Sequence, residues 1–207
     1  MGAIPPSAPR RDPLASCSAP PPALFANVNL YFILVCCLLL LGVSINLDIL
    51  KHFLGSERYW EGLYIVPILL LAYLFLGVYY NLSVWFKLTD KTHYGTIITI
   101  GGALITIGGN YILIPIAGYL GSCWVTLICY FSMTAACYWL GQKNYPIPYN
   151  VTKSFGYIVS TVAIIYLVGL ISIENQWVAT GFHMAVILIY VIVVYLLENK
   201  RFKQAST

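Results

Sequence analysis

Six long apolar stretches follow one another along this chain, and they limit its fold more than any other feature. Each has at least the roughly 20 residues that an α-helix needs to cross a hydrocarbon layer of about 30 Å. Their apolar residues do not alternate with polar ones, which excludes transmembrane β-strands. The sequence therefore predicts an all-α, polytopic membrane protein with six transmembrane helices. The stretches are residues 27–50, 62–86, 94–117, 119–141, 153–173 and 176–197.

The positive charges gather on one side of this predicted topology. Six crossings place both ends of the chain on the same side, and nine of the eleven Lys and Arg residues fall there, whereas only Lys51 and Arg58 fall on the other. Cytoplasmic loops carry the excess of positive charge, so both termini are predicted to be cytoplasmic. The nine are Arg10, Arg11, Lys87, Lys91, Lys143, Lys153, Lys200, Arg201 and Lys203.

Composition excludes several functional classes. With 60% hydrophobic and 9% charged residues the chain lies outside the range of soluble globular proteins. The net charge of +4 is spread in small groups over loops, where topology explains it, so no nucleic-acid partner is expected. The six cysteines form no C-x-x-C pair, and no catalytic or nucleotide-binding motif is present. We therefore predict a non-enzyme without metal or cofactor.

Residues 1–26 differ in composition from the rest of the chain. They hold seven of the eleven prolines, with alanines and serines between them. Such a segment cannot form a packed core and is expected to be disordered or extended, either as a tail or as a leader foreign to the protein. Residues 27–203 then form the six-helix unit, and residues 204–207 end a cytoplasmic tail.

Small residues recur on one face of the stretch 94–117. Their spacing of three and four residues places them together on a helix. Such a stripe favours close helix–helix packing in a membrane, and a polar cavity wall is the alternative. The stripe consists of Gly95, Thr99, Gly102, Thr106 and Gly109.

The end of the same stretch carries turn-forming residues. Pro115 removes a backbone hydrogen bond, and the side chain of Asn110 is placed to bond the freed carbonyls. Gly118 and Gly121 then permit a sharp reversal into the next stretch. This region is predicted to be a terminated helix with a tight turn.

The second stretch suggests a cavity wall. Tyr73 and Asn81 share a face within the predicted span, where a buried amide needs a polar partner or water. Trp85 and Lys87 follow at the cytoplasmic boundary, where interfacial aromatic residues and snorkelling lysines are common.

The last stretch contains one ionisable residue, His183, on the face that also carries Ile187 and Tyr190. A hydrogen-bonded packing histidine is preferred over a functional one because no carboxylate accompanies it. The predicted spans contain no carboxylate pair, which argues against a proton relay or a sodium site.

One segment resembles a recurring transporter pattern. Residues 110–126 read NYILIPIAGYLGSCWVT, which is similar to the Asn-x-x-x-Ile-Pro-x-x-Gly-x-x-Gly-Ala-Ala-x-Ala-Thr run that joins two helices in the multidrug/oligosaccharidyl-lipid/polysaccharide exporter superfamily. The segments VPIL at 66–69, YYNLSVW at 79–85 and KLTDKT at 87–92 resemble its polysaccharide (O-antigen and capsule) flippase branch. The Ser122-Cys123 departure from Ala-Ala is mild.

The resemblance covers residues 27–203 and aligns with the C-terminal half of a two-lobe, MATE-like transporter. It implies a bacterial inner-membrane flippase lobe that moves undecaprenyl-diphosphate-linked oligosaccharide for surface polysaccharide or lipopolysaccharide synthesis. The implied partners are membrane lipid, the lipid-linked oligosaccharide, and an N-terminal lobe or a second copy. Tyr73, Asn81, Lys87 and Lys91 are the candidate cavity residues.

Two alternatives remain open. The chain could be half of a MATE-type small-molecule exporter, for which the lack of an intramembrane carboxylate is unfavourable. It could also be a non-transporting membrane protein, such as a truncated product or an assembly partner.

Overall fold

A computed structural model describes residues 22–47, 51, 60–144, 147–171 and 176–205. These residues form helices and no strands, as an all-α protein requires. Residues 1–21 of the predicted leader lie outside the described residues. The helices are α1 (Pro22–Ile45), α3 (Trp60–Leu63), α4 (Val66–Leu82), α5 (Val84–Leu88), α6 (His93–Asn144), α7 (Val151–Gly169) and α8 (Gln176–Ala205).

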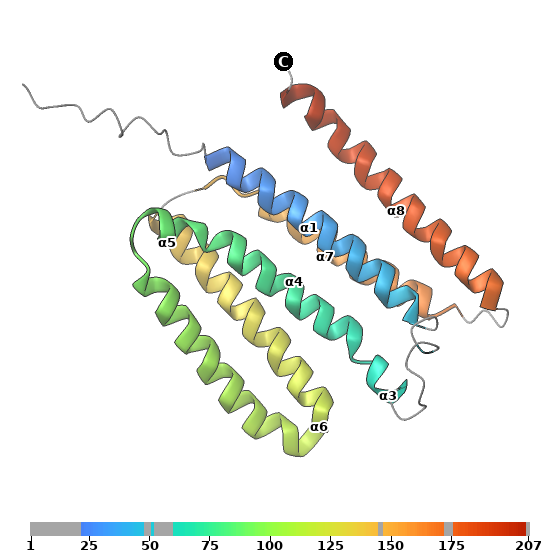
Figure 1. Cartoon of the computed structure of the whole chain (residues 1–207), viewed down its shortest axis with the longest axis horizontal. Coiled ribbons are helices and arrows are strands. Elements are labelled where there is room, and N and C mark those ends of the chain that lie inside the picture. Colours follow the sequence, from blue (N-terminus) through green and yellow to red (C-terminus); the bar gives the residue numbers. More distant parts are fainter. Residues whose placement is uncertain (1–21, 48–50, 52–59, 145–146, 172–175, 206–207) are drawn as a thin grey trace, which may run out of the picture.

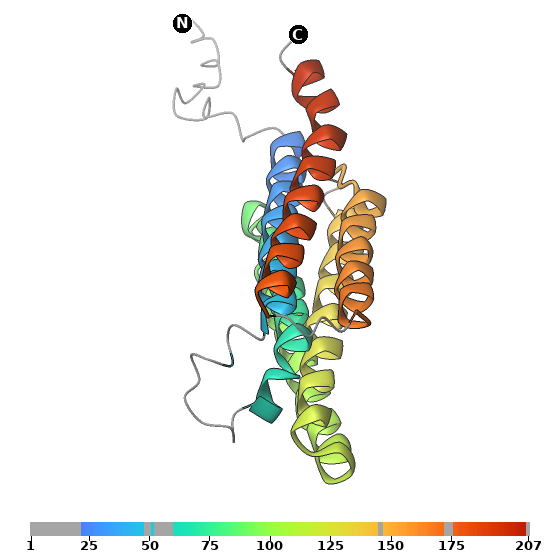
Figure 2. The ribbon, with the colours of Figure 1, turned by 90° about the vertical axis from the view of Figure 1, so that its right-hand side faces the viewer.

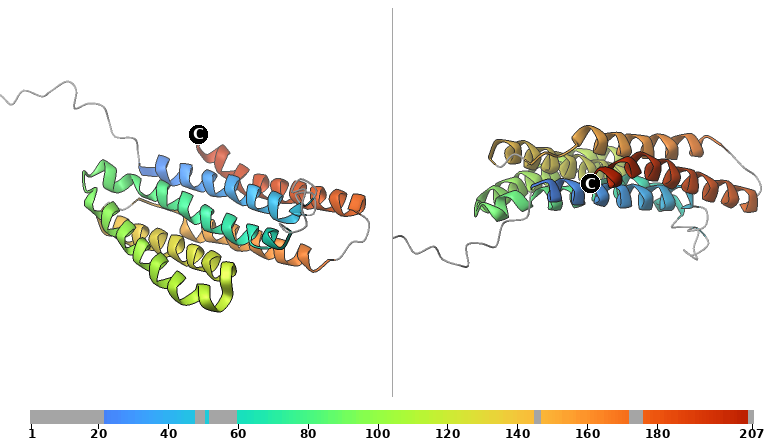
Figure 3. Two further views of the ribbon diagram at one scale, coloured as in Figure 1. Left: turned by 60° about the horizontal axis from the view of Figure 1, so that its bottom comes forward. Right: turned by 90° about the horizontal axis from the view of Figure 1, so that it is seen from above.

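The long helices run back and forth along one common direction (Figure 1). The start of α1 and the end of α8 lie at the same end of the bundle, which we call the termini end, and the opposite end is called the distal end (Figures 1 and 2). α4 packs mainly on α6, while α1 packs on α4, α7 and, less extensively, α8. The bundle has two layers, with α7 and the second half of α6 in one of them (Figures 2 and 3).

Helix α1 begins earlier than the apolar pattern predicts. The structure places its first residue at Pro22, although the predicted span starts at Asn27 and the predicted leader ends at Ala26. Proline suits the first turn of a helix because its missing N–H would have no intrahelical partner there. The following Ala, Leu and Phe then continue the helix without a break.

Helix α6 reverses its direction at Gly118. Its 52 residues are far more than one membrane crossing needs, and Gly118 has φ 57° and ψ −137°, outside the helical region. Two antiparallel arms result, residues 93–117 and 119–144, which fold against each other as a hairpin (Figure 1). Because only glycine adopts this backbone conformation at little cost, Gly118 fixes where the hairpin turns.

Glycines let the two arms approach closely. A Cβ atom on Gly102 would lie 2.6 Å from the Met133 sulfur, and one on Gly109 would lie 2.8 Å from the Val125 side chain. The tightest approach is at Gly121, where a Cβ atom would lie 2.5 Å from the Leu113 carbonyl oxygen. Without an apolar driving force between helices in lipid, such backbone proximity is what gives the arms their packing energy.

Trp85 lies inside the bundle, contrary to the prediction of an interfacial aromatic residue. Its side chain is 1% exposed and packs against Tyr94, with ring centroids 5.5 Å apart. Gly141 makes room for it, because a Cβ there would lie 3.0 Å from the indole ring. The short α5 turns this residue inward, whereas Lys87 on the same helix is exposed.

Five helices within the described residues are long and apolar enough to cross a membrane: α1, α4 with α5, α6, α7 and α8. Side chains that are large, apolar and exposed cover the outside of the bundle, including Ile107, Ile116 and Leu188. A soluble protein does not expose so much contiguous apolar surface. The structure therefore indicates a multi-pass membrane protein.

We expect Gly121→Ala to destabilise the α6 hairpin by about 1–3 kcal/mol, because backbone atoms cannot move aside as a flexible side chain can. Thermal unfolding in detergent would measure the loss. Gly108→Ala is the matched control, since a Cβ at Gly108 meets nothing within 4 Å. Equal stability of the two variants would show that the arms do not approach at Gly121.

Candidate functional site: a pocket at the distal end

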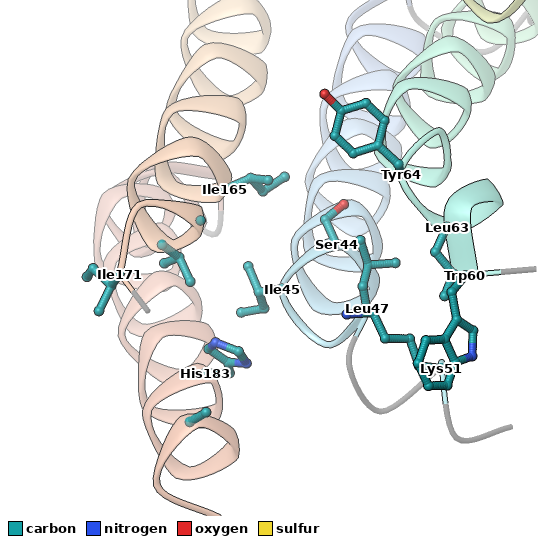
Figure 4. Close-up of a pocket in the computed structure, with 13 residues that line it drawn as sticks. Ser44, Ile45, Leu47, Lys51, Trp60, Leu63, Tyr64, Ile165, Ile171 and His183 are labelled. Carbon is teal, nitrogen blue, oxygen red and sulfur yellow. The ribbon is translucent and has the colours of Figure 1, made fainter. Parts of the chain in front are cut away.

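A pocket of about 550 Å³ opens at the distal end of the bundle. Its walls come from the end of α1, the α3–α4 region, the end of α7 and the start of α8 (Figure 4). Ligand pockets commonly occupy about 300–1,000 Å³, so the size is suited to a small molecule or one part of a larger one. Its polar and aromatic lining residues are Ser44, Lys51, Trp60, Tyr64 and His183.

The break between α3 and α4 brings two aromatic residues to the pocket. Pro67 lies in the first turn of α4, where it cannot supply the hydrogen bond that would continue α3 into α4. Ile65 N–H instead bonds the Gly62 carbonyl, in a tight turn. Tyr64 lies within this turn and Trp60 two residues before it, and their side chains are 72% and 44% exposed.

Ser44 supplies a polar atom without a partner. It lies in the last turn of α1, its side chain is 8% exposed, and its hydroxyl has no hydrogen-bond partner among the described residues. A buried hydroxyl left unpaired costs about 1–3 kcal/mol. Because Ser44 lines the pocket, this unpaired hydroxyl lies at the pocket wall.

The remaining polar groups face the pocket from two sides. His183 lies on the α8 side of the pocket, and Lys51 and Trp60 lie on the side formed by the end of α1 and by α3 (Figure 4). His183 is half-buried, and its ring contacts that of Phe182 at a centroid distance of 6.2 Å. His183 thus lies at a pocket wall, and the expectation that it is a packing residue rather than a functional one stays a prediction.

The four predicted cavity residues do not line this pocket. Tyr73 lies midway along α4 with its side chain 57% exposed, and its ring contacts Tyr130 at a centroid distance of 6.0 Å. The Asn81 amide donates to the Gly77 carbonyl of its own helix, at 3.2 Å.

The two predicted cavity lysines lie at the termini end (Figure 1). Lys87 is exposed, whereas Lys91 is half-buried and its Nζ donates to Asn144 Oδ1 at 3.2 Å. This bond joins the loop before α6 to the end of α6. Lys91 therefore has a structural partner, and Lys87 faces outward.

The predicted hinge residues are gathered in α6. Thr106 donates to the Gly102 carbonyl at 3.0 Å, so its hydroxyl is satisfied within the helix. Asn110 Oδ1 is buried and has no partner among the described residues, whereas the bond expected of this side chain, from its Nδ2 to a freed carbonyl, stays a prediction. Pro115 is exposed on the outside of the hairpin, three residues before Gly118.

Sequence reasoning missed a buried carboxylate in α8. Glu198 is one residue beyond the predicted end of the last span, yet its side chain is only 3% exposed. The Tyr157 hydroxyl donates to Glu198 Oε1 at 3.0 Å, and Oε2 has no hydrogen-bond partner among the described residues. A second polar pair joins the same helices, between Thr161 and Tyr190 at 2.9 Å.

The pattern that could have revealed Glu198 is helical spacing. Residues 183, 187, 190, 194 and 198 repeat at intervals of four and three, so they share one face. The sequence prediction for this face ends at Tyr190, and Glu198 lies just beyond the hydrophobic run, which ends at Leu197.

The connection between α6 and α7 also contains a buried group. Burial raises the pKa of Tyr149 to about 12, and the neighbouring Cys137 thiol contributes to the rise. The Tyr149 hydroxyl has no hydrogen-bond partner among the described residues. Its role is apolar packing, with its ring 6.4 Å from that of Tyr138.

A scan against protein-family models and searches of curated proteins and of solved structures found no match.

We expect Tyr157→Phe to lower the stability of the protein by about 1–3 kcal/mol, because it leaves a buried carboxylate without its hydroxyl donor. Unfolding in detergent would measure the change. Tyr166→Phe is the control, since Tyr166 lies on the same helix with its side chain 69% exposed. A double-mutant cycle with Glu198→Ala, which removes the acceptor, isolates the pair, and a coupling energy near zero would contradict the prediction.

Proposed function

We propose that this chain is the C-terminal lobe of a bacterial inner-membrane flippase. Its cargo is an oligosaccharide linked to undecaprenyl diphosphate, which it moves toward the external leaflet for the synthesis of surface polysaccharide such as O-antigen. Lipid and the lipid-linked glycan are its partners. A second lobe, either a separate N-terminal lobe or another copy of this chain, completes the transport path.

The observation that carries the proposal is the agreement between one sequence pattern and one structural feature. Residues 110–126 resemble the segment that joins two helices in the exporter superfamily, and α6 reverses at Gly118 within this segment. The second glycine of this segment that the resemblance includes, Gly121, is where the two arms of α6 approach most closely. The residues that define the resemblance thus have a physical task in this fold.

The proposed topology has six crossings, with each arm of α6 crossing once. Both termini lie on the cytoplasmic side, together with Lys87, Lys91, Lys143 and Lys153. The start of α1 and the end of α8 lie at the same end of the bundle, and this position and the distribution of positive charge support the orientation. The distal pocket then faces the external side.

The proposed mechanism is alternating access, in which two lobes rock about a central path. Such a transporter makes and breaks no covalent bond, so no catalytic residue is assigned. The lobe supplies a rigid body in which the α6 hairpin and α4 move as a unit, because these elements share the most extensive packing in the bundle.

Complementation in a bacterium without its O-antigen flippase tests the proposal, with surface glycan as the readout. We expect restoration when the chain is produced together with an N-terminal lobe from a flippase of the same branch. Restoration by the chain alone would assign transport to a dimer. Failure of both, with the protein stably inserted, would favour a non-transporting protein.

The cytoplasmic lysines provide a second test. If Lys87 and Lys91 contact the diphosphate, Lys87→Gln with Lys91→Gln should reduce export at least about tenfold at unchanged protein levels. Lys143→Gln is the control, because Lys143 is an exposed lysine at the same end. Asn144→Ala removes the hydrogen-bond partner of Lys91 but keeps both lysines, so it measures the effect of losing that structural bond alone. Unchanged export in the double variant would remove both lysines from the mechanism.

Glu198 gives some support to a second candidate, half of a cation-coupled small-molecule exporter. An ionisable residue buried in a membrane protein commonly marks an ion path. Its position at the end of α8, far from the middle of the bundle, makes this candidate the weaker one, since transporter ion sites lie near the membrane midplane. Drug resistance conferred by the chain with a second lobe, abolished by Glu198→Gln, would favour it.

A further inference from the structure

We propose that the distal pocket binds a saccharide unit of the cargo, an inference that rests on the proposed flippase function. The pocket combines exposed aromatic rings, an unpaired buried hydroxyl, a lysine amine and a histidine imidazole in about 550 Å³. It lies within this one lobe, so the second lobe is not needed to form it.

Aromatic rings suit one face of a sugar. A pyranose has an apolar face of C–H groups, which stacks on an indole or phenol ring as other apolar groups do. Trp60 and Tyr64 both line the pocket, and the turn at the α3–α4 break holds them at its edge. They keep 44% and 72% of their side chains exposed, and this surface is available to a ligand.

Polar side chains suit the rim of hydroxyls on the same sugar. Sugar hydroxyls both donate and accept hydrogen bonds, and so do the Ser44 hydroxyl and a neutral imidazole such as that of His183. Ser44 is the more telling residue, because its buried hydroxyl has no partner among the described residues. A ligand hydroxyl in the pocket would satisfy it. Lys51 adds a further donor at the opposite wall.

The position of the pocket fits a late step of transport. In the proposed topology it opens on the external side, at the end of the bundle opposite Lys87 and Lys91. A glycan that arrives there has already left the cytoplasmic leaflet. The pocket would hold its sugar portion while the lipid portion remains in the membrane.

Binding of a lipid-free glycan tests the inference directly. The full chain in nanodiscs is titrated with the lipid-free oligosaccharide repeat unit from the complementation host, and binding is followed by saturation-transfer NMR and calorimetry. We expect Trp60→Ala to weaken binding about tenfold, as the loss of one aromatic contact would. Trp124→Ala is the matched control, because Trp124 is 49% exposed and does not line the pocket.

Ser44→Ala provides a second, conservative variant. It removes the unpaired hydroxyl without removing packing, so it should weaken binding about threefold or more while stability is unchanged or raised. Equal binding by the Trp60 and Trp124 variants, together with normal binding by the Ser44 variant, would overturn the inference. Binding of glycerol phosphate by a chain that does not bind the oligosaccharide would also overturn the inference, because the pocket would then hold a lipid head group.

The binding and export assays separate the two proposals. If the chain binds glycan in a way that depends on Trp60 but does not restore export, the pocket proposal stands and the flippase proposal is rejected. If the chain binds no glycan but restores export, and Trp60→Ala and Ser44→Ala leave export unchanged, the flippase proposal stands and the pocket proposal is rejected.

Discussion

The close approach of the two arms of α6 is the contact on which the rest of the bundle depends. Lipid solvates an apolar side chain as well as another helix does, so apolar burial alone cannot hold these helices together. The arms meet where Gly102, Gly109 and Gly121 leave room, and α4 packs on the hairpin that results. α1 then packs on α4, and α7 packs on α1. Each later contact uses a surface that the earlier one has positioned.

Much of this fold could be predicted from the sequence, because its strongest signals are local. Length and apolarity identified the helices, and Gly118 and Gly121 marked the turn, since glycine is permitted where other residues are not. The start of α1 and the burial of Trp85 were missed. In the first case the proline-rich composition of residues 1–26 predicted a disordered segment, whereas α1 already begins at Pro22. In the second, burial depends on a neighbour, Gly141, that lies far away in the sequence.

The candidate site was much less predictable, because pockets arise from segments that are distant in the chain. Ser44, Trp60 and His183 come from three parts of the sequence, and none of them belongs to a motif. Tyr73 and Asn81 share a helical face, yet a shared face does not tell whether it meets lipid, another helix or a cavity. Glu198 shows the same limit, since its hydrogen-bond donor, Tyr157, lies on another helix.

The hairpin of α6 also has a consequence for how the chain enters a bilayer. No Asp, Glu, Lys or Arg lies between Lys91 and Lys143, so its turn carries no charge across the hydrocarbon. Moving a charged loop through the bilayer would cost several kcal/mol, whereas a turn made of Gly118 and its apolar neighbours avoids that barrier. The two arms can therefore insert together as one unit during synthesis. In the proposed topology, Lys91 and Lys143 at the two ends of the hairpin stay on the cytoplasmic side and set its orientation.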